Sequence, residues 1–280
     1  MRISRPSWSC PYFLAAIILS CAATARAQEP QAPAAPPAHL QLIWENPIRP
    51  GHKFFVGVLF SLDPGWHIYW QNPGDSGEPP KILWNLPPGY HGGEIIWPVP
   101  VPLGTGTIRD YGYEGKVLLM APLLTPRDLD PNASAELSAT VKYVVCREIC
   151  IPGKAELKVS VPLYGQVIVG QRPWRDTFQK TLKQVPNPPP NDWKVSAAST
   201  EKNFVLKIEA PDEPNSVMFF PLDAGVIENS APQEFVADKK GFHLTLKKSG
   251  QLLKPVAKLR GVVVLDINRG YEIDVPVKSQ

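Results

Sequence analysis

The 280-residue sequence has few cysteines, little net charge and no long apolar run near its start. It contains only 4 cysteines, and Cys10 and Cys21 fall within the first 27 residues. The apolar run from Tyr12 to Leu19 is far shorter than the roughly 20 residues that a transmembrane helix requires. The short apolar run therefore excludes a bilayer-spanning helix at that place. The low cysteine count leaves only two cysteines outside the first 27 residues.

The first 27 residues have the order of a secretory signal. Arg2 and Arg5 precede the apolar run, and Ala25-Arg-Ala27 supplies the small residues of a cleavage site. We expect cleavage after Ala27 and export to a bacterial periplasm. An imperfect lipid-attachment box, Ile18-Leu-Ser-Cys21, leaves open the alternative of a lipoprotein that is held at the membrane through Cys21.

Removal of this segment changes both the charge and the cysteine content of the chain. Three arginines and no acidic residues are lost, which leaves 26 basic and 26 acidic residues. No basic stripe remains, so nucleic acid is excluded as an expected partner. Cys146 and Cys150 are then the only cysteines, in a compartment where disulfides form and persist.

Short strands and frequent turns dominate the next part of the sequence. The 33 prolines and 20 glycines interrupt the chain often, which favours strands over long helices. Turns are expected at Asp63-Pro-Gly65, Asn72-Pro-Gly74, Pro87-Pro-Gly89 and Pro152-Gly153, and Asp75-Ser-Gly-Glu78 is interpreted as a polar turn. Seven strands are expected at Phe54–Phe60, His67–Trp70, Lys81–Leu86, Glu94–Trp97, Val117–Leu123, Ala135–Val145 and Ala155–Leu163. This spacing predicts an immunoglobulin-like β-sandwich.

The rest of the chain predicts a second sandwich after a short helix. Pro173 suits a first helical turn, and Trp174, Phe178 and Leu182 share one helix face. We predict an all-β protein with two immunoglobulin-like β-sandwich domains, joined by this helix and a Pro-rich linker. The predicted segments are a signal peptide (1–27), a Pro/Ala-rich tether (28–38), a sandwich with the cysteine pair (39–165), the helix and linker (166–191) and a smaller sandwich (192–280).

The cysteine pair lies between two expected strands that are close enough in sequence to form an antiparallel hairpin. Residues four apart on one extended strand would lie about 13 Å apart, which is too far for a disulfide. Paired residues across a hairpin lie about 4.5–5.5 Å apart, so Cys146 and Cys150 can bond only if the chain turns back between them. Redox chemistry, a structural staple and a copper(I) site formed by the same two sulfurs all remain open at this point.

Three separated stretches resemble one known family. The segment from Val141 to Pro162 is similar to the active-site hairpin of the periplasmic N-terminal domain of DsbD-type thiol:disulfide interchange proteins, and especially of the ScsB-like branch. Pro64–Gly77 and Ile108–Gly115 resemble two further stretches of that family, in the same order. Residues 190–280 are similar to the second β-domain of the ScsB-like branch. The sequence differs from full-length members in having no membrane or thioredoxin domain, which predicts a stand-alone module.

The resemblance implies a site and a function. Cys146 and Cys150 are the implied redox pair, with Cys150 forming the mixed disulfide and Cys146 resolving it. Arg109, Asp110, Tyr111 and Tyr113 match a cap loop that covers the disulfide in the family. The implied partners are thioredoxin-like periplasmic proteins and a membrane electron-transfer protein, with no cofactor beyond the disulfide. Family roles of this kind include cytochrome c biogenesis and copper tolerance.

The aromatic segment Trp66–Trp70 completes the expected site. Strand alternation places Trp66, Ile68 and Trp70 on the core face, and His67 and Tyr69 on the other face, where they border the redox pair. We therefore predict a thiol:disulfide exchange protein. The alternatives are a copper(I)-binding or delivery protein that uses the same cysteines, and a non-catalytic β-sandwich adaptor.

Overall fold

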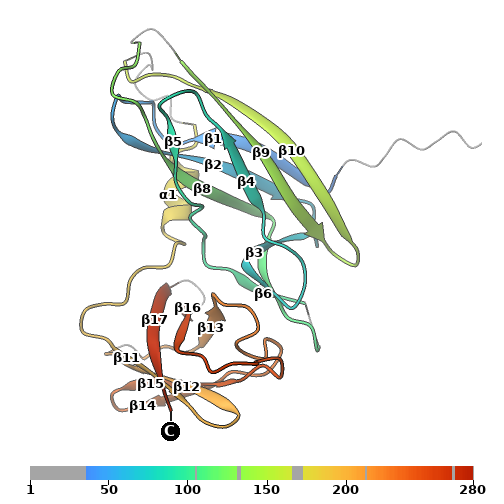
Figure 1. Cartoon of the computed structure of the whole chain (residues 1–280), viewed down its shortest axis with the longest axis vertical. Helices are drawn as coiled ribbons and strands as arrows, with labels where there is room; N and C mark the ends of the chain where they lie inside the picture. Colours follow the sequence, from blue (N-terminus) through green and yellow to red (C-terminus); the bar gives the residue numbers. More distant parts are fainter. Residues whose placement is uncertain are drawn as a thin grey trace, which may run out of the picture. The chain divides into compact units, whose positions relative to one another are not determined.

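A computed structural model describes residues 36–104, 106–130, 134–165, 173–211, 213–266 and 269–279. The predicted signal peptide and most of the predicted tether lie outside these residues. The described residues form 17 strands and one helix, as Figure 1 shows. The prediction of two immunoglobulin-like β-sandwich domains joined by a short helix is confirmed.

Two sheets form the first sandwich. One sheet has the order β1-β2-β8-β5, with β1 at Ala38–Trp44, β2 at Lys53–Leu62, β8 at Lys116–Leu124 and β5 at His91–Gly92. The other has the order β10-β9-β3-β7-β6, with β4 also paired to β9. Its strands are β3 (His67–Gly74), β4 (Lys81–Asn85), β6 (Val101–Leu103), β7 (Asp110–Glu114), β9 (Ala135–Cys146) and β10 (Cys150–Val161).

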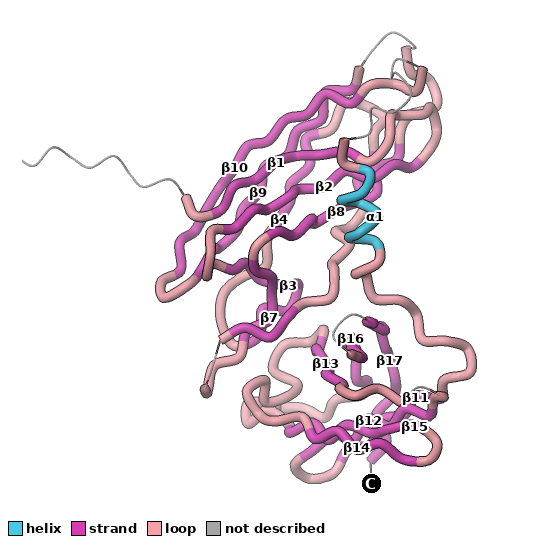
Figure 2. The backbone as a smooth tube through the Cα atoms, turned by 180° about the vertical axis from the view of Figure 1, so that it is seen from behind, coloured by secondary structure: helices cyan, strands magenta, loops and turns pink. Residues whose placement is uncertain are grey.

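Strict alternation of side chains creates the core between these sheets. In β9 the apolar side chains from Leu137 to Val145 at every second position are buried, while the intervening positions face the other side of the sheet. The core brings Val58, Phe60 and Leu119 of one sheet against Ile68 and Trp70 of the other. β9 and β10 thereby form a long hairpin with one face on the core and one outer face (Figure 2).

A single helix covers the outside of the first sheet. α1 spans Arg175–Leu182, and Phe178 on its inner face is completely buried. Phe178 packs in a cluster with Ile43, Leu118 and Met120 from β1 and β8. The predicted stripe of apolar residues is therefore a packing surface. Within the described residues, no helix is long and apolar enough to cross a membrane.

The second sandwich has one sheet that closes over its own core. The strand order is β13-β16-β17-β11-β12-β15-β14. The bounds are β11 Lys194–Ser199, β12 Asn203–Glu209, β13 Val217–Pro221, β14 Glu234–Asp238, β15 Gly241–Lys247, β16 Lys258–Leu265 and β17 Arg269–Ser279. Its core joins Phe204 and Phe242 from one end of the sheet to Phe219 and Leu259 from the other.

The two sandwiches also share apolar and polar contacts. Phe220 of β13 is buried and packs edge-on against Trp70 at 6.3 Å and Tyr111 at 5.2 Å between ring centroids. The Asn72 side-chain amide donates a hydrogen bond of 2.8 Å to the carbonyl oxygen of Pro221. Residues 36–280 accordingly form one compact unit rather than two separate bodies.

Several expected boundaries were wrong. β1 begins at Ala38, inside the predicted tether, because Ala38 already pairs with Leu62. Residues 94–97 are not a strand and contribute only an isolated bridge between Ile96 and Met120. Pro152 and Gly153 belong to β10 and do not form a turn.

The error at Pro152 and Gly153 has a physical reason. β10 lies at the edge of its sheet, where the missing N–H of a proline is tolerated. A Cβ atom at Gly153 would lie 2.3 Å from the ring of Tyr143, so the glycine makes room for a buried aromatic side chain. Both residues are therefore compatible with a strand here, although they usually signal a turn.

Candidate redox site

The two cysteines form a disulfide at the turn of the β9–β10 hairpin. β9 ends at Cys146 and β10 begins at Cys150, and these residues pair directly across the ladder. The S–S distance is 2.07 Å and the Cα–Cα distance is 4.2 Å. The chain thus turns back through residues 147–149, as the spacing required.

The two sulfur-bearing residues differ in their access to solvent. Cys146 is 2% exposed, whereas Cys150 is exposed at the start of an edge strand. Arg147 in the turn lies over the ring of Trp66 at 5.2 Å, which ties the turn to the segment before β3. The arrangement offers one sulfur of the bond to an incoming reactant and protects the other.

A row of side chains crosses the sheet beside the disulfide. Cys146 pairs with Cys150 on one side and with His67 of β3 on the other, and His67 pairs in turn with Glu114 of β7. Side chains of directly paired residues project to the same face of a sheet. The outer face therefore carries two sulfurs, an imidazole and a carboxylate in sequence.

His67 is the unusual member of this row. Its Nε2 atom is buried and has no hydrogen-bond partner among the described residues. Burial lowers the pKa of His67 below its usual value, although the carboxylates of Asp110 and Glu114 partly oppose this effect. The imidazole is consequently neutral at pH 7 and is available to accept a proton.

Tyr69 lies against the exposed sulfur. Its side-chain oxygen is 3.7 Å from Cys150 Sγ, within reach of a hydrogen bond to sulfur, and its ring stacks edge-on with His67 at 5.3 Å. Burial raises the pKa of Tyr69, a hydrogen bond with Ser76 lowers it, and the charge of Asp110 raises it again. The raised pKa keeps the phenol protonated, so Tyr69 can donate to a cysteine thiolate.

The segment after β3 covers the Tyr69 ring. A Cβ atom at Gly77 would lie only 2.1 Å from that ring, so glycine is required at this close approach. Asp110 holds the segment in place by accepting hydrogen bonds from the Ser76 amide at 2.8 Å and the Ser76 hydroxyl at 2.7 Å. The polar turn predicted at residues 75–78 is thus part of the site.

The predicted cap residues occupy different places. Asp110 is on the sulfur-bearing side and orders the loop over Tyr69. The Arg109 amide donates to Asp75 Oδ2 at 2.7 Å, and its guanidinium donates to the Gly104 carbonyl at 3.0 Å. These two residues therefore organise the border of the site through hydrogen bonds.

Tyr111 and Tyr113 project from the opposite face of β7, into the core. The Tyr111 hydroxyl donates to Asn229 Oδ1 at 3.0 Å, and the Tyr113 hydroxyl donates to the Pro98 carbonyl at 2.7 Å. The structure does not bring these two side chains to the sulfurs, and Cys150 stays exposed. The cap expected from the resemblance is, at these two positions, a core strand.

Sequence reasoning missed Ser76 and Gly77 as neighbours of the site. Their contacts depend on how β3, β7 and the hairpin lie together, and no local pattern marks them. The one available signal was Gly77, since glycine in a polar turn also permits a ring to approach the backbone closely.

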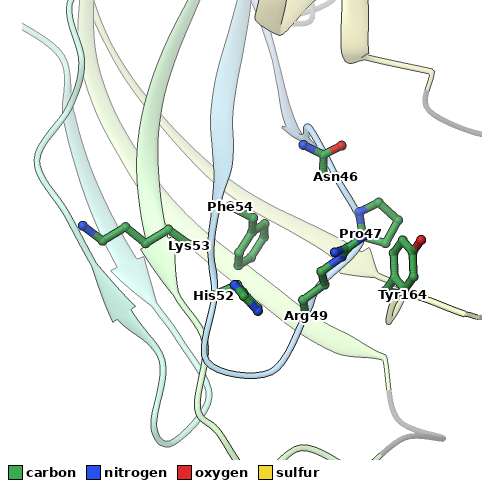
Figure 3. A pocket seen from close by; sticks show the side chains of 7 residues that line it. All are labelled: Asn46, Pro47, Arg49, His52, Lys53, Phe54 and Tyr164. Carbon is green, nitrogen blue, oxygen red and sulfur yellow. The ribbon is translucent and has the colours of Figure 1, made fainter.

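Within the described residues, no group of three or more His, Cys, Asp or Glu side chains is placed to hold a metal ion. A cavity of about 290 Å³ lies by the β1–β2 turn, where Arg49 packs over Tyr164 at 3.7 Å (Figure 3). This cavity is at the other end of the hairpin, about 35 Å along β10 from Cys150, and is separate from the disulfide.

The first sandwich matches a known family. Residues 39–162 match the family described as "Thiol:disulfide interchange protein DsbD, N-terminal". The chain therefore carries a DsbD N-terminal domain. The matched residues include the whole β9–β10 hairpin and all the predicted site residues. Its cysteine pair is accordingly that of a thiol:disulfide interchange-type domain.

One solved structure agrees with this assignment at the level of the fold. The crystal structure of the N-terminal periplasmic domain of ScsB from Proteus mirabilis matches with a TM-score of 0.65 and 16% identity, and the match covers 89% of this chain and 97% of that one. The periplasmic chaperone SfaE matches with a TM-score of 0.22 at 11% identity, over 86% of this chain and all of that one. No curated protein sequence matches the chain. The ScsB domain thus has the same fold as this chain over both the first sandwich and the second sandwich that follows it.

Proposed function

We propose that this protein exchanges electrons with partner proteins through Cys146 and Cys150. The observation that carries the proposal is the asymmetry of the disulfide. Cys150 is exposed beside a phenol, and Cys146 is buried beside an imidazole whose Nε2 atom has no hydrogen-bond partner among the described residues. Thiol–disulfide exchange needs one sulfur that a partner can attack and a second that leaves and later returns.

The oxidised protein would react first at Cys150. A partner thiolate attacks Cys150 Sγ, a bond forms between the two sulfurs, and the Cys146–Cys150 bond breaks. Cys146 leaves as a thiolate. The partner's second cysteine, as a thiolate, then attacks the sulfur of the partner's first cysteine in the mixed disulfide. This step closes a disulfide in the partner and releases Cys150 as a thiolate.

The reverse direction uses the same atoms. The Cys150 thiolate attacks a partner disulfide, the partner's leaving sulfur departs as a thiolate, and a mixed disulfide forms. Cys146 then attacks Cys150 Sγ and releases the partner as a dithiol, with two electrons transferred to it. Cys146 must lose its proton before that second attack.

His67 is suited to take the proton from Cys146. It pairs directly with Cys146 in the ladder, which places the two Cβ atoms about 4.5–5.5 Å apart. Its lowered pKa keeps the imidazole neutral, and its buried Nε2 atom accepts or donates no hydrogen bond within the part of the chain that the structure describes. Removal of His67 should therefore slow the step that resolves the mixed disulfide more than the step that forms it.

Tyr69 is suited to stabilise the Cys150 thiolate. Its hydroxyl lies 3.7 Å from Cys150 Sγ, and a thiolate accepts a hydrogen bond more strongly than a thiol does. The hydrogen bonds from Ser76 to Asp110 fix the loop that packs on the Tyr69 ring. The Tyr69 hydroxyl would favour the Cys150 thiolate by donating a hydrogen bond to it, and Asp110 would keep the Tyr69 ring in the position that this hydrogen bond requires.

We place this exchange in the bacterial periplasm, with thioredoxin-like proteins and a membrane electron-transfer protein as partners. The family match and the signal-like N-terminus support that location. No cofactor other than the disulfide is required, because the two sulfurs carry both electrons.

Two measurements test the proposal. Equilibration of the protein with glutathione buffers should give a reversible potential above about −300 mV, whereas structural disulfides lie below that value. Cys146→Ser should accumulate mixed disulfides with partner proteins, and Cys150→Ser should accumulate few. A potential below that limit, or equal trapping by both variants, would assign the bond to a structural role.

The same variants report on the alternative functions. Among the residues that the structure describes, the two sulfurs belong to no group of three or more His, Cys, Asp or Glu side chains that could hold a metal ion, so no observation favours copper(I) binding as a second proposal. Tight one-to-one binding of copper(I) to the reduced protein, lost in Cys146→Ser, would overturn this preference. Full cellular function of Cys150→Ser would instead support a non-catalytic adaptor.

A further inference from the structure

The outer face of the β9–β10 hairpin is hollowed next to the disulfide. Along β10, Cys150, Pro152 and Lys154 project to this face in turn, and their ladder partners are Cys146, Val144 and Lys142. A cavity of about 410 Å³ lies there, with Val144 and Pro152 among its lining residues. The sulfur that a partner reaches is therefore the end of a longer surface.

Three lysines stand side by side across this hollow. Lys142 of β9 pairs with Lys154 of β10 on one side and with Lys81 of β4 on the other. Figure 1 shows these three strands as neighbours. We call the surface formed by Val144, Pro152, Lys81, Lys142 and Lys154 the lysine groove.

The lysine row is unfavourable for the isolated protein. Like charges directly opposite each other destabilise a sheet. Two of the lysines have acidic neighbours, since Lys154 Nζ is 2.8 Å from Glu156 and Lys81 Nζ is 4.0 Å from Glu78. Lys142, between them, forms no described ion pair. An anionic group at the centre of the row would relieve this repulsion.

The spacing relates the groove to the exchanging sulfur. At about 3.3 Å per residue, Pro152 lies about 7 Å and Lys154 about 13 Å along the strand from Cys150. An extended chain that placed its own cysteine on Cys150 would put its second residue from that cysteine over Val144 and Pro152. Its fourth residue would lie over the lysines.

We propose that the lysine groove binds the segment of a partner protein that adjoins its reacting cysteine. This inference rests on the proposed function and adds the chemistry of the partner. The segment is extended, apolar two residues from its cysteine and acidic four residues from it. Apolar contact with Val144 and Pro152 positions the cysteine, and the acidic side chain pairs with Lys142.

The bound segment takes part in the exchange described above. The Cys150 thiolate attacks the disulfide sulfur of the docked cysteine, the leaving thiol departs, and the Cys150–partner bond forms. Cys146 then displaces the partner cysteine as a thiolate and restores the Cys146–Cys150 disulfide. Docking changes the rate of the first attack and does not change its stoichiometry.

The test uses the full reduced protein and three disulfide probes. Two are synthetic peptides whose cysteine is activated as a thiopyridyl disulfide, with valine two residues before the cysteine and either glutamate or lysine four residues before it. The third is hydroxyethyl disulfide, which is small and uncharged. Stopped-flow absorbance gives the rate constant for thiopyridine release, and alkylation of the thiols that remain on the protein gives the rate with the small probe.

We expect the glutamate peptide to react roughly tenfold faster than the lysine peptide at low salt, because opposite charge accelerates encounter. The ratio should fall toward one at 0.5 M salt because ions screen this attraction. Lys142→Glu should reverse the preference. Lys158→Glu, which makes the same charge change on the same outer face of β10 beyond the groove, should preserve it.

The possible results separate the inference from the proposed function. Equal rates with both peptides, or equal effects of Lys142→Glu and Lys158→Glu, would overturn the proposal that the lysine groove binds a partner segment. Normal reaction with hydroxyethyl disulfide in the same experiment would uphold the exchange function. Failure of the wild-type protein with all three probes would overturn both. A dimer in sedimentation that Lys142→Glu dissociates would make the groove a contact between copies and overturn the docking proposal.

Discussion

The position of the disulfide predicts that its reduction costs the fold little. The bond closes a loop of only five residues, from Cys146 to Cys150. The chain-entropy relation assigns about 2 kcal/mol to a loop of this size, against about 4.7 kcal/mol for a loop of 100 residues. β9 and β10 are also joined along all 12 residues of each strand, with Val141 and Val145 in the core. The hairpin should therefore survive without the bond.

The same quantity fixes a difference between two reduction potentials. A bond that stabilises the folded state by about 2 kcal/mol is itself stabilised by folding to the same extent. For a two-electron couple, 1.4 kcal/mol corresponds to about 30 mV, so the potential of the folded protein should lie about 40 mV below that of the unfolded chain.

Urea unfolding with and without a reducing agent measures the first value. With an m-value of about 2–3 kcal/mol/M, the midpoint should fall by roughly 0.7–1 M on reduction. The double variant Cys146→Ala/Cys150→Ala serves as control and should not respond to the reductant. Titration of folded and urea-unfolded protein against glutathione gives the potential difference.

Two results would refute this reasoning. Unfolding on reduction in the absence of urea, or a loss above about 4 kcal/mol, would show that the bond holds the sandwich together. The matching electrochemical result is a difference above about 90 mV. Either would favour a staple over an exchange site.

Three further predictions concern the packing around the site. Gly153→Val should lower the free energy of unfolding by about 1–3 kcal/mol in urea titration, because the new Cβ would lie 2.3 Å from the Tyr143 ring. Phe220→Ala should lower it by about 3–5 kcal/mol in the same assay, since this buried ring packs on Trp70 and Tyr111. Because the pKa of His67 is lowered, the unfolded chain binds a proton at this residue more readily than the folded protein does. The free energy of unfolding should therefore fall as the pH drops below about 6.5. His67→Gln should reduce the dependence of this free energy on pH between about pH 7.5 and 5.5.

Matched variants control the packing predictions. No atom lies within 4 Å of a Cβ added at Gly250, so Gly250→Val should lower the free energy of unfolding far less than Gly153→Val does. Met218 lies two residues before Phe220 and is 36% exposed, so Met218→Ala should change stability by only a fraction of the Phe220→Ala value. Equal losses within either pair, or an unchanged pH slope in His67→Gln, would contradict the packing and burial described for these residues.

Local sequence patterns were enough to indicate the class of fold. Alternation in residues 155–163, turns rich in proline and glycine, and the Trp174–Phe178–Leu182 stripe all report on short stretches of chain. Such patterns fail where a residue's usual preference is overruled by a distant neighbour. Gly153 is placed in a strand by the ring of Tyr143, and Pro152 is tolerated because β10 is an edge strand.

The candidate site divides in the same way. The four-residue spacing of Cys146 and Cys150 determined that a bond requires a tight reversal of the chain, because covalent geometry allows no other arrangement. Alternation also placed His67 and Tyr69 on the face away from the core. The difference in exposure between the two sulfurs was not predictable, since it depends on β3 on one side of β9 and solvent beside β10.

The sequence by itself determined an all-β chain with one bondable pair of cysteines, because strand period and disulfide geometry are local properties. Only the tertiary structure decided that His67 pairs with Cys146, that Tyr69 reaches Cys150, and that Tyr111 faces the core against Phe220. It also aligned Lys81, Lys142 and Lys154 beside the exchanging sulfur. These are contacts between strands far apart in the chain, and strand order and register, which no local pattern encodes, set every one of them.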